Sequence, residues 1–174
     1  MTTGPARGAP QGVTLRPDLA EMRFRRGYLC SQAVLSSFAP DLGLETDAAF
    51  RIAAAFGGGI AGRGETCGAV LGACMALGLR HGRTEASGQE REDRVNALAQ
   101  AFITAFAGRN GSILCRDLLG VDLGDPDGGR LASERNLFAT VCPGLVRDAA
   151  EILERLLELE PARSGAGDAI LAER

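Results

Sequence analysis

Three of the five cysteines in this 174-residue chain stand where the sequence predicts that a helix begins. They are Cys67 in the segment 64–69, Cys115 at the end of the segment 111–115, and Cys142 in the segment 140–144. A helix start has unpaired backbone N–H groups and a partial positive charge, which favour the ionised thiolate. Thiolate is the form that attacks disulfides and peroxides and that binds metals. We therefore expect thiolate chemistry at these positions.

The spacing of the cysteines excludes some kinds of site. No two of them have the Cys-x-x-Cys spacing of a thioredoxin-like motif or a zinc knuckle. Cys67 and Cys74 are two helical turns apart, about 10 Å along the axis, which is too far for a disulfide. We interpret Cys74 as a core residue. The single histidine, His81, suits the negative end of the same helix and is interpreted as neither a ligand nor a base.

Among the thiols, Cys67 is predicted to be the most reactive. Thr66 can cap the predicted helix, and the glycines before it leave room for an incoming sulfur atom or ligand. Five of the eight residues 57–64 are glycine, so this loop is expected to have unusual backbone dihedrals or a close contact. Its Gly-x-Gly-x-x-Gly pattern follows a predicted helix, whereas a dinucleotide fingerprint follows a strand.

We therefore interpret the glycine-rich loop as a tight turn that aims Cys67, with a small anion at the helix start as an alternative. The candidate cofactor- or anion-binding residues are Gly58, Gly59, Gly64 and Gly68.

Periodic apolar residues indicate the elements that must position these groups. They predict helices at about 17–26, 29–39, 46–56, 66–80, 89–107, 113–119, 130–140 and 143–158. No segment alternates like a strand, so the predicted fold is all-α, a compact single-domain helical bundle of about six to eight helices. The expected organisation is a mobile N-terminal arm (1–16), a helical four-cysteine domain (17–160) and a loose C-terminal tail (161–174).

The predicted helix at 66–80 is apolar on nearly all sides and should be central and buried. Its three glycines, Gly68, Gly72 and Gly78, each cost about 1 kcal/mol of helix propensity relative to alanine. Close approach by another helix or by a ligand would compensate for this cost. We expect Gly68 and Gly72 to be such contact points beside Cys67.

Composition restricts the class of protein. Hydrophobic residues make up 45% of the chain and the mean hydropathy is +0.03, as in globular proteins. No apolar run reaches the roughly 18 residues of a membrane-spanning helix, so no membrane insertion is expected. The first residues lack the apolar core of a secretion signal, which favours the cytoplasm, where thiols stay mostly reduced. The net charge of -3 gives no basic surface for nucleic acid.

Segments along most of the chain resemble the C_GCAxxG_C_C family of putative redox-active proteins. They are residues 27–35, 55–59, 64–73, 115–120 and Cys142, within a match of roughly residues 20–155. The resemblance implies that Cys30, Cys67, Cys115 and Cys142 are the functional cysteines, as catalytic thiols or as metal ligands if a metal is bound. Leu29 departs from the family pattern, where a polar residue is expected, and should make the surroundings of Cys30 drier.

We expect these four cysteines to converge in one site that excludes Cys74. They would cycle between thiol and disulfide, or hold a redox metal centre, in thiol exchange or electron transfer with a small redox partner or thiol substrate. If the protein is an enzyme, a thiol oxidoreductase is the expected class. One alternative is a non-catalytic protein that holds zinc, copper or an iron–sulfur cluster. Another is a small-anion binding module at the glycine-rich loop. The helix at 143–158 is a candidate homodimer contact.

Overall fold

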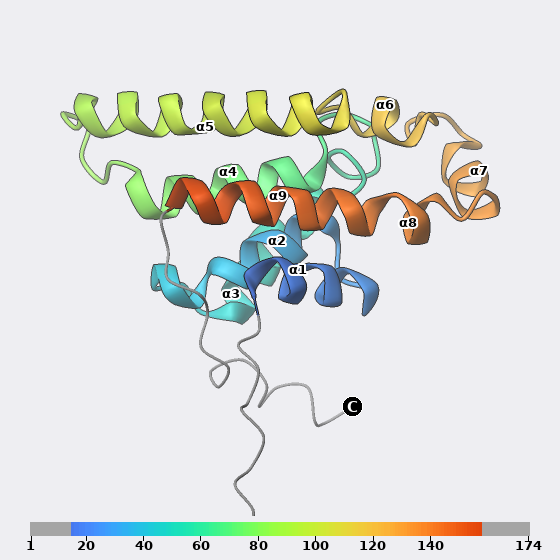
Figure 1. Ribbon diagram of the computed structural model, residues 1–174, viewed down its shortest axis with the longest axis horizontal. Helices are drawn as coiled ribbons and strands as arrows, with labels where there is room; N and C mark the ends of the chain where they lie inside the picture. Colours follow the sequence, from blue (N-terminus) through green and yellow to red (C-terminus); the bar gives the residue numbers. More distant parts are fainter. Residues whose placement is uncertain (1–14, 158–174) are drawn as a thin grey trace, which may run out of the picture.

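The computed structural model describes residues 15–157, which form helices joined by loops, with no strand among them (Figure 1). The α-helices are α1 (Arg16–Arg25), α2 (Cys30–Phe38), α3 (Thr46–Ala53), α4 (Gly68–His81), α5 (Gln89–Asn110), α6 (Cys115–Leu119), α7 (Gly128–Glu134), α8 (Leu137–Thr140) and α9 (Cys142–Leu157). Two 3-10 turns, η1 (Pro40–Leu42) and η2 (Ala54–Phe56), follow α2 and α3. The predicted all-α fold is confirmed. None of these helices is both long and apolar enough to cross a membrane.

The predicted N-terminal arm and C-terminal tail lie outside the described residues, except for Leu15 and Arg16 at the end of the arm. Arg16, expected at the end of the arm, begins α1. Its guanidinium is buried and pairs with Asp41 and Glu154, at 2.9 and 3.1 Å. The folded domain therefore begins with an ion pair that joins α1 to η1 and α9.

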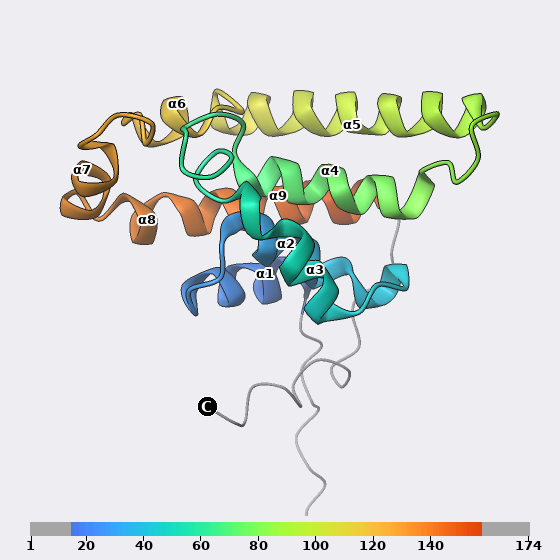
Figure 2. The same ribbon diagram turned by 180° about the vertical axis from the view of Figure 1, so that it is seen from behind.

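Helices α4 and α9 lie side by side at the centre of the fold, with α5 along one side and α1, α2 and α3 along the other (Figures 1 and 2). The largest fully buried side chains include Phe38, Phe102, Phe106, Leu77 and Leu153. These side chains come from four helices, α2, α4, α5 and α9, which share one core. The apolar face of α9 packs against α1, α4 and α5 within the chain, so its pattern of apolar residues is explained without a second copy.

The contact between α2 and α4 depends on two glycines. A Cβ atom added at Gly72 would lie 2.6 Å from the carbonyl oxygen of Ser31 and 3.2 Å from Cβ of Val34. One added at Gly68 would lie 2.5 Å from Sγ of Cys30. Real Cβ atoms essentially never come this close, so α2 approaches the backbone of α4 only because side chains are absent there. The expected contact role of both glycines agrees with this geometry.

The loop between η2 and α4 contains a turn of left-handed backbone. Residues 58–62 all have positive φ, and two of them, Ile60 (62°) and Ala61 (52°), are not glycine. Backbone hydrogen bonds hold the turn, including Gly62 N–H to Gly57 O and Gly64 N–H to Gly58 O, both 3.1 Å. An L-residue in this region costs roughly 1–2 kcal/mol, so the loop stores strain beside Cys67.

Replacing Ala61 by glycine should stabilise the protein by about 1 kcal/mol, because glycine adopts a positive φ without the steric penalty. The matched control is Ala97→Gly, at an exposed position inside α5, where the loss of helix propensity should cost about 1 kcal/mol. Urea unfolding measures both changes. A loss of stability in both variants would contradict the strain at Ala61.

Two predicted helix boundaries were wrong. Helix α4 begins at Gly68, and Thr66 does not cap it but forms an isolated antiparallel bridge with Leu114. The helix predicted at 130–140 is two helices, α7 and α8, because Asn136 between them has a φ of 55°. Asparagine tolerates the left-handed region better than most residues, so it ends one helix and begins another here.

Candidate functional site

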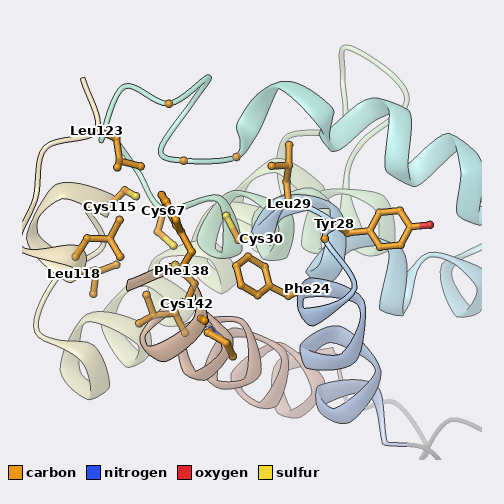
Figure 3. Close-up of a pocket in the computed structure, with 18 of the residues that line it drawn as sticks. Phe24, Tyr28, Leu29, Cys30, Cys67, Cys115, Leu118, Leu123, Phe138 and Cys142 are labelled. Atoms are coloured by element: carbon orange, nitrogen blue, oxygen red, sulfur yellow. The ribbon is translucent and has the colours of Figure 1, made fainter. Parts of the chain in front are cut away.

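Four of the five cysteines line one cavity of about 790 Å³, and each lies at the start of a helix (Figure 3). Cys30, Cys115 and Cys142 are the first residues of α2, α6 and α9, and Cys67 immediately precedes α4. Cys74 does not line the cavity. The structure thus brings together the four cysteines selected from the sequence and leaves out the fifth.

A short antiparallel bridge between Thr66 and Leu114 holds Cys67 next to Cys115. The two hydrogen bonds that flank it are Cys67 N–H to Ile113 O and Cys115 N–H to Glu65 O, both 2.7 Å. Alternate residues of an extended segment face the same side, so the cysteines after Thr66 and after Leu114 project from the same face of the bridge. Figure 2 shows the loop before α4 reaching α6, where this bridge forms.

Arg116 ties the start of α6 to the glycine-rich loop. Its Nε donates to the carbonyl oxygen of Gly64 at 3.1 Å, and Nη1 donates to Asp122 at 2.9 Å. Nη2 donates to Glu65 in a short hydrogen bond. A single exposed ion pair contributes little to the stability of a protein. This network, however, joins the start of α6, which carries Cys115, to Gly64 and Glu65 on one side and to Asp122 on the other. We therefore regard Arg116 as a positioning residue.

Cys30 and Cys67 form a hydrogen-bonded pair of buried thiols. The Cys67 thiol donates to Sγ of Cys30, and the backbone N–H groups of Gly58, Ser31 and Cys30 itself add further donors. Against the opposing effect of burial, these hydrogen bonds lower the pKa of Cys30 to about 6. The shared hydrogen bond, burial and the negative charge of Cys30 raise the pKa of Cys67 well above its usual value.

The prediction that Cys67 is the most reactive thiol stays a prediction, but the hydrogen bonds at the site favour ionisation of Cys30 over Cys67. Both cysteines lie at helix starts, but more backbone N–H groups reach Cys30, whereas Cys67 receives one, from Ala69. Thr66 is engaged in the bridge with Leu114 and does not cap the helix. The acidic thiol is Cys30, and Cys67 is its hydrogen-bond donor.

The other two cysteines of the site stay protonated at neutral pH. Burial, followed by the negative charge of Cys30, raises the pKa of Cys115 to about 11. The same two causes raise the pKa of Cys142 to about 12. The site at neutral pH therefore contains one thiolate and three thiols, and the thiolate is hydrogen-bonded to one of them.

The four glycines predicted to bind a cofactor or an anion have different surroundings. Gly58 lines the cavity and donates its N–H to Cys30. At Gly59, an added Cβ would lie 2.5 Å from the backbone N of Glu65, and at Gly64 it would overlap the side chain of Asp122. These two glycines, like Gly68, make room for other parts of the chain. A cofactor role for the four remains a prediction.

The cavity wall is mostly apolar, and the sequence analysis did not identify it. Its large side chains are those of Phe24, Tyr28, Leu29, Leu118, Leu119, Leu123, Phe138 and Leu145. They come from α1, α6, α8, α9 and the loops next to them. The spacing of apolar residues along a helix predicts which face of the helix is buried. It does not show whether that face lines a cavity or packs in a filled core. Leu29 lies over Gly57 in this wall but is 40% exposed, so the predicted dry surroundings of Cys30 stay a prediction.

Within residues 15–157, no group of three or more His, Cys, Asp or Glu side chains is arranged to hold a metal ion. A model of one protein family matches residues 28–156 of the chain, and its description is putative redox-active protein (C_GCAxxG_C_C). No curated protein and no solved structure matches the chain significantly. The matched range contains all four cysteines of the cavity.

Proposed function

Because the chain belongs to the C_GCAxxG_C_C family of putative redox-active proteins, we propose that it performs thiol–disulfide exchange with Cys30 and Cys67 as the reacting pair. One observation carries this proposal: Cys30 and Cys67 stand at the starts of two packed helices in the wall of one cavity, where Sγ of Cys30 lies against the backbone of Gly68, the residue after Cys67. A hydrogen bond from the Cys67 thiol, the largest cause, lowers the pKa of Cys30. The thiolate is the nucleophile of thiol–disulfide exchange, and a second thiol next to it can complete the reaction.

In the proposed reaction, the Cys30 thiolate attacks one sulfur atom of a substrate disulfide. A bond forms between Sγ of Cys30 and that sulfur atom, the substrate S–S bond breaks, and the first thiolate leaves and takes up a proton. Cys67 then loses its proton and attacks Sγ of Cys30, which releases the second substrate thiolate. The substrate gains two electrons and two protons and becomes two thiols, and the protein gains a Cys30–Cys67 disulfide.

The raised pKa of Cys67 suits its place in this sequence. Before the reaction, the negative charge of Cys30 keeps Cys67 protonated, so only one nucleophile meets the substrate. Once Cys30 has formed the mixed disulfide, that charge is gone. Cys67 then ionises more readily and attacks. The hydrogen bond between the two sulfur atoms also places the second nucleophile beside the sulfur atom that it must reach.

Cys115 and Cys142 provide a second pair of thiols on the same cavity. In the proposal, exchange of this pair with the Cys30–Cys67 disulfide restores the first two thiols and moves the disulfide to Cys115 and Cys142. The transfer moves two electrons within the chain. Burial, and after it the charge of Cys30, raises the pKa of both thiols, so oxidation of the first pair removes the smaller of these two causes and makes their ionisation easier.

The two alternative functions have less support from the geometry. Four cysteine sulfurs suit zinc, copper or an iron–sulfur cluster, and they line one cavity, but the described residues would have to move to share one metal ion. Anion binding at the glycine-rich loop needs free N–H groups. Those of Gly58, Gly64 and Glu65 already donate to Cys30, Gly58 and Gly59, respectively.

The test is the fate of the thiols when reduced, anaerobically purified protein meets one equivalent of 2-hydroxyethyl disulfide. We expect the loss of two free thiols per chain and, in the peptide map, a Cys30–Cys67 crosslink, or a Cys115–Cys142 crosslink where the disulfide has moved on, because both pairs line one cavity. The control is Cys74→Ser, which removes the cysteine outside the cavity and should react like the parent protein. Metal analysis and the optical spectrum are recorded on the same sample. Unreactive thiols together with a stoichiometric metal or a cluster absorption band would overturn the proposal in favour of metal binding.

A further inference from the structure

The cavity beside Cys30 has a wall that fits one chemical class of substrate, and we propose that the protein selects neutral, apolar disulfides. This inference rests on the proposed function and deepens it, because it names the substrate. Three features of the cavity carry it: the apolar nature of its wall, the ion pair that engages its one arginine, and the engagement or orientation of the donors of Gly58 and Tyr28.

Hydrocarbon and aromatic side chains line the cavity around and between the cysteines (Figure 3). The largest are Phe24, Leu29, Leu118, Leu123, Phe138 and Leu145. A cavity of about 790 Å³ is large enough to enclose a small organic molecule, and a wall of this kind binds through the burial of apolar surface. A substrate that carries hydrocarbon groups on its two sulfur atoms would bury those groups against this wall while a sulfur atom meets Cys30.

Charged disulfides find little in the cavity to replace their hydration. Among the described residues that line it, Arg25 is the one with a permanently charged side chain. Its guanidinium already pairs with Glu21 at 2.7 Å. An anionic peptide disulfide would therefore leave water without gaining a free cation, which costs affinity. The ionised Cys30 adds repulsion against an anion.

The same wall distinguishes a disulfide from a quinone, the other small two-electron acceptor that a dithiol can reduce. Quinone oxygens need hydrogen-bond donors when they are buried. The N–H of Gly58 is taken by Cys30, and the Tyr28 ring stacks on Phe50, with its hydroxyl pointing away from the cysteines (Figure 3). A disulfide has no strong hydrogen-bond acceptor, so it loses no strong hydrogen bond when it moves from water into such surroundings.

The experiment compares diethyl, dipropyl and dibutyl disulfide with 2-hydroxyethyl disulfide and glutathione disulfide. The second-order rate constant for loss of the Cys30 thiol is measured at pH 7, and each value is divided by the rate constant of free cysteine with the same disulfide. This normalisation removes differences in the leaving thiol. We expect the ratio to rise about fourfold for each methylene group that is buried. Glutathione disulfide should be at least about tenfold slower than dipropyl disulfide.

Two variants locate the effect. Phe138→Asp places a carboxylate in the wall, so the ratio should lose its dependence on chain length. Leu79→Asp is the matched control, because Leu79 is exposed, does not line the cavity, and lies near the far end of α4 from Cys67. This variant should keep the parent dependence. Thermal melting shows whether each variant is folded, and the chain-length series on the parent protein decides the question without either of them.

The outcomes separate the inference from the proposed function. If the Cys30–Cys67 disulfide forms with 2-hydroxyethyl disulfide but the ratios are equal across the alkyl series, the apolar selection is wrong and the exchange reaction stands. The same conclusion would follow if glutathione disulfide were the fastest substrate. If no disulfide in the series oxidises the pair, both proposals fail together.

Discussion

Replacing Cys30 by serine should remove the one thiol that reacts rapidly in mildly acidic solution. With a pKa of about 6, about a tenth of Cys30 is thiolate at pH 5, whereas a free cysteine with a pKa near 8.5 is about 0.03% thiolate. The lower nucleophilicity of an acidic thiolate offsets part of this gain. We expect Cys30 to react with iodoacetamide about 20-fold faster than free cysteine at pH 5. The Cys30→Ser variant should lose this phase.

The pH profile gives the sign of the effect. A lowered pKa means that the thiolate is present above about pH 6 and is lost as the pH falls, so the rate at Cys30 should rise to half its plateau near pH 6. Cys74→Ser is the matched control, because burial raises the pKa of Cys74 and its loss should leave the fast phase intact. A fast phase that persists in Cys30→Ser and disappears in Cys67→Ser alone would assign the thiolate to Cys67 instead.

Replacing Gly72 by alanine should destabilise the protein by about 1–3 kcal/mol, the typical cost of forcing an extra group into a packed contact. The new Cβ would lie 2.6 Å from the carbonyl oxygen of Ser31, which belongs to the backbone of α2 and cannot rotate away. The two helices would have to separate. Urea unfolding measures the change in the free energy of unfolding.

Gly78 is the matched control in the same helix. An added Cβ there meets no atom within 4 Å, so Gly78→Ala should stabilise the protein by about 0.5–1 kcal/mol through helix propensity. The two substitutions are chemically identical and are expected to have opposite signs. A gain of stability in both would show that Gly72 is merely tolerated in α4 and is not a contact point with α2.

The sequence alone predicted the features that depend on residues close to one another in the chain. Apolar spacing predicted the helices, and the thiol placement together with the family pattern selected the four cysteines that line the cavity. It also identified Gly68 and Gly72 as contact points, because glycine inside an apolar helix needs a compensating contact. Cys30 was placed one residue inside a predicted helix start. In the structure, Cys30 is the first residue of α2, and the Gln32 side chain accepts a hydrogen bond from the N–H of Leu29, the residue before it.

Tertiary structure alone decided which thiol is ionised and what surrounds it. The pKa of Cys30 depends on donors from Gly58 and Cys67, which lie in other segments of the chain and reach it only after folding. The cavity wall combines side chains from several helices, such as Phe24 of α1 and Phe138 of α8. From the sequence, each of these residues can be described only as apolar or polar within its own helix. Electrostatics and cavity shape depend on distances between segments, so they arise only when the chain packs α1, α2, α4, α6 and α9 around one space.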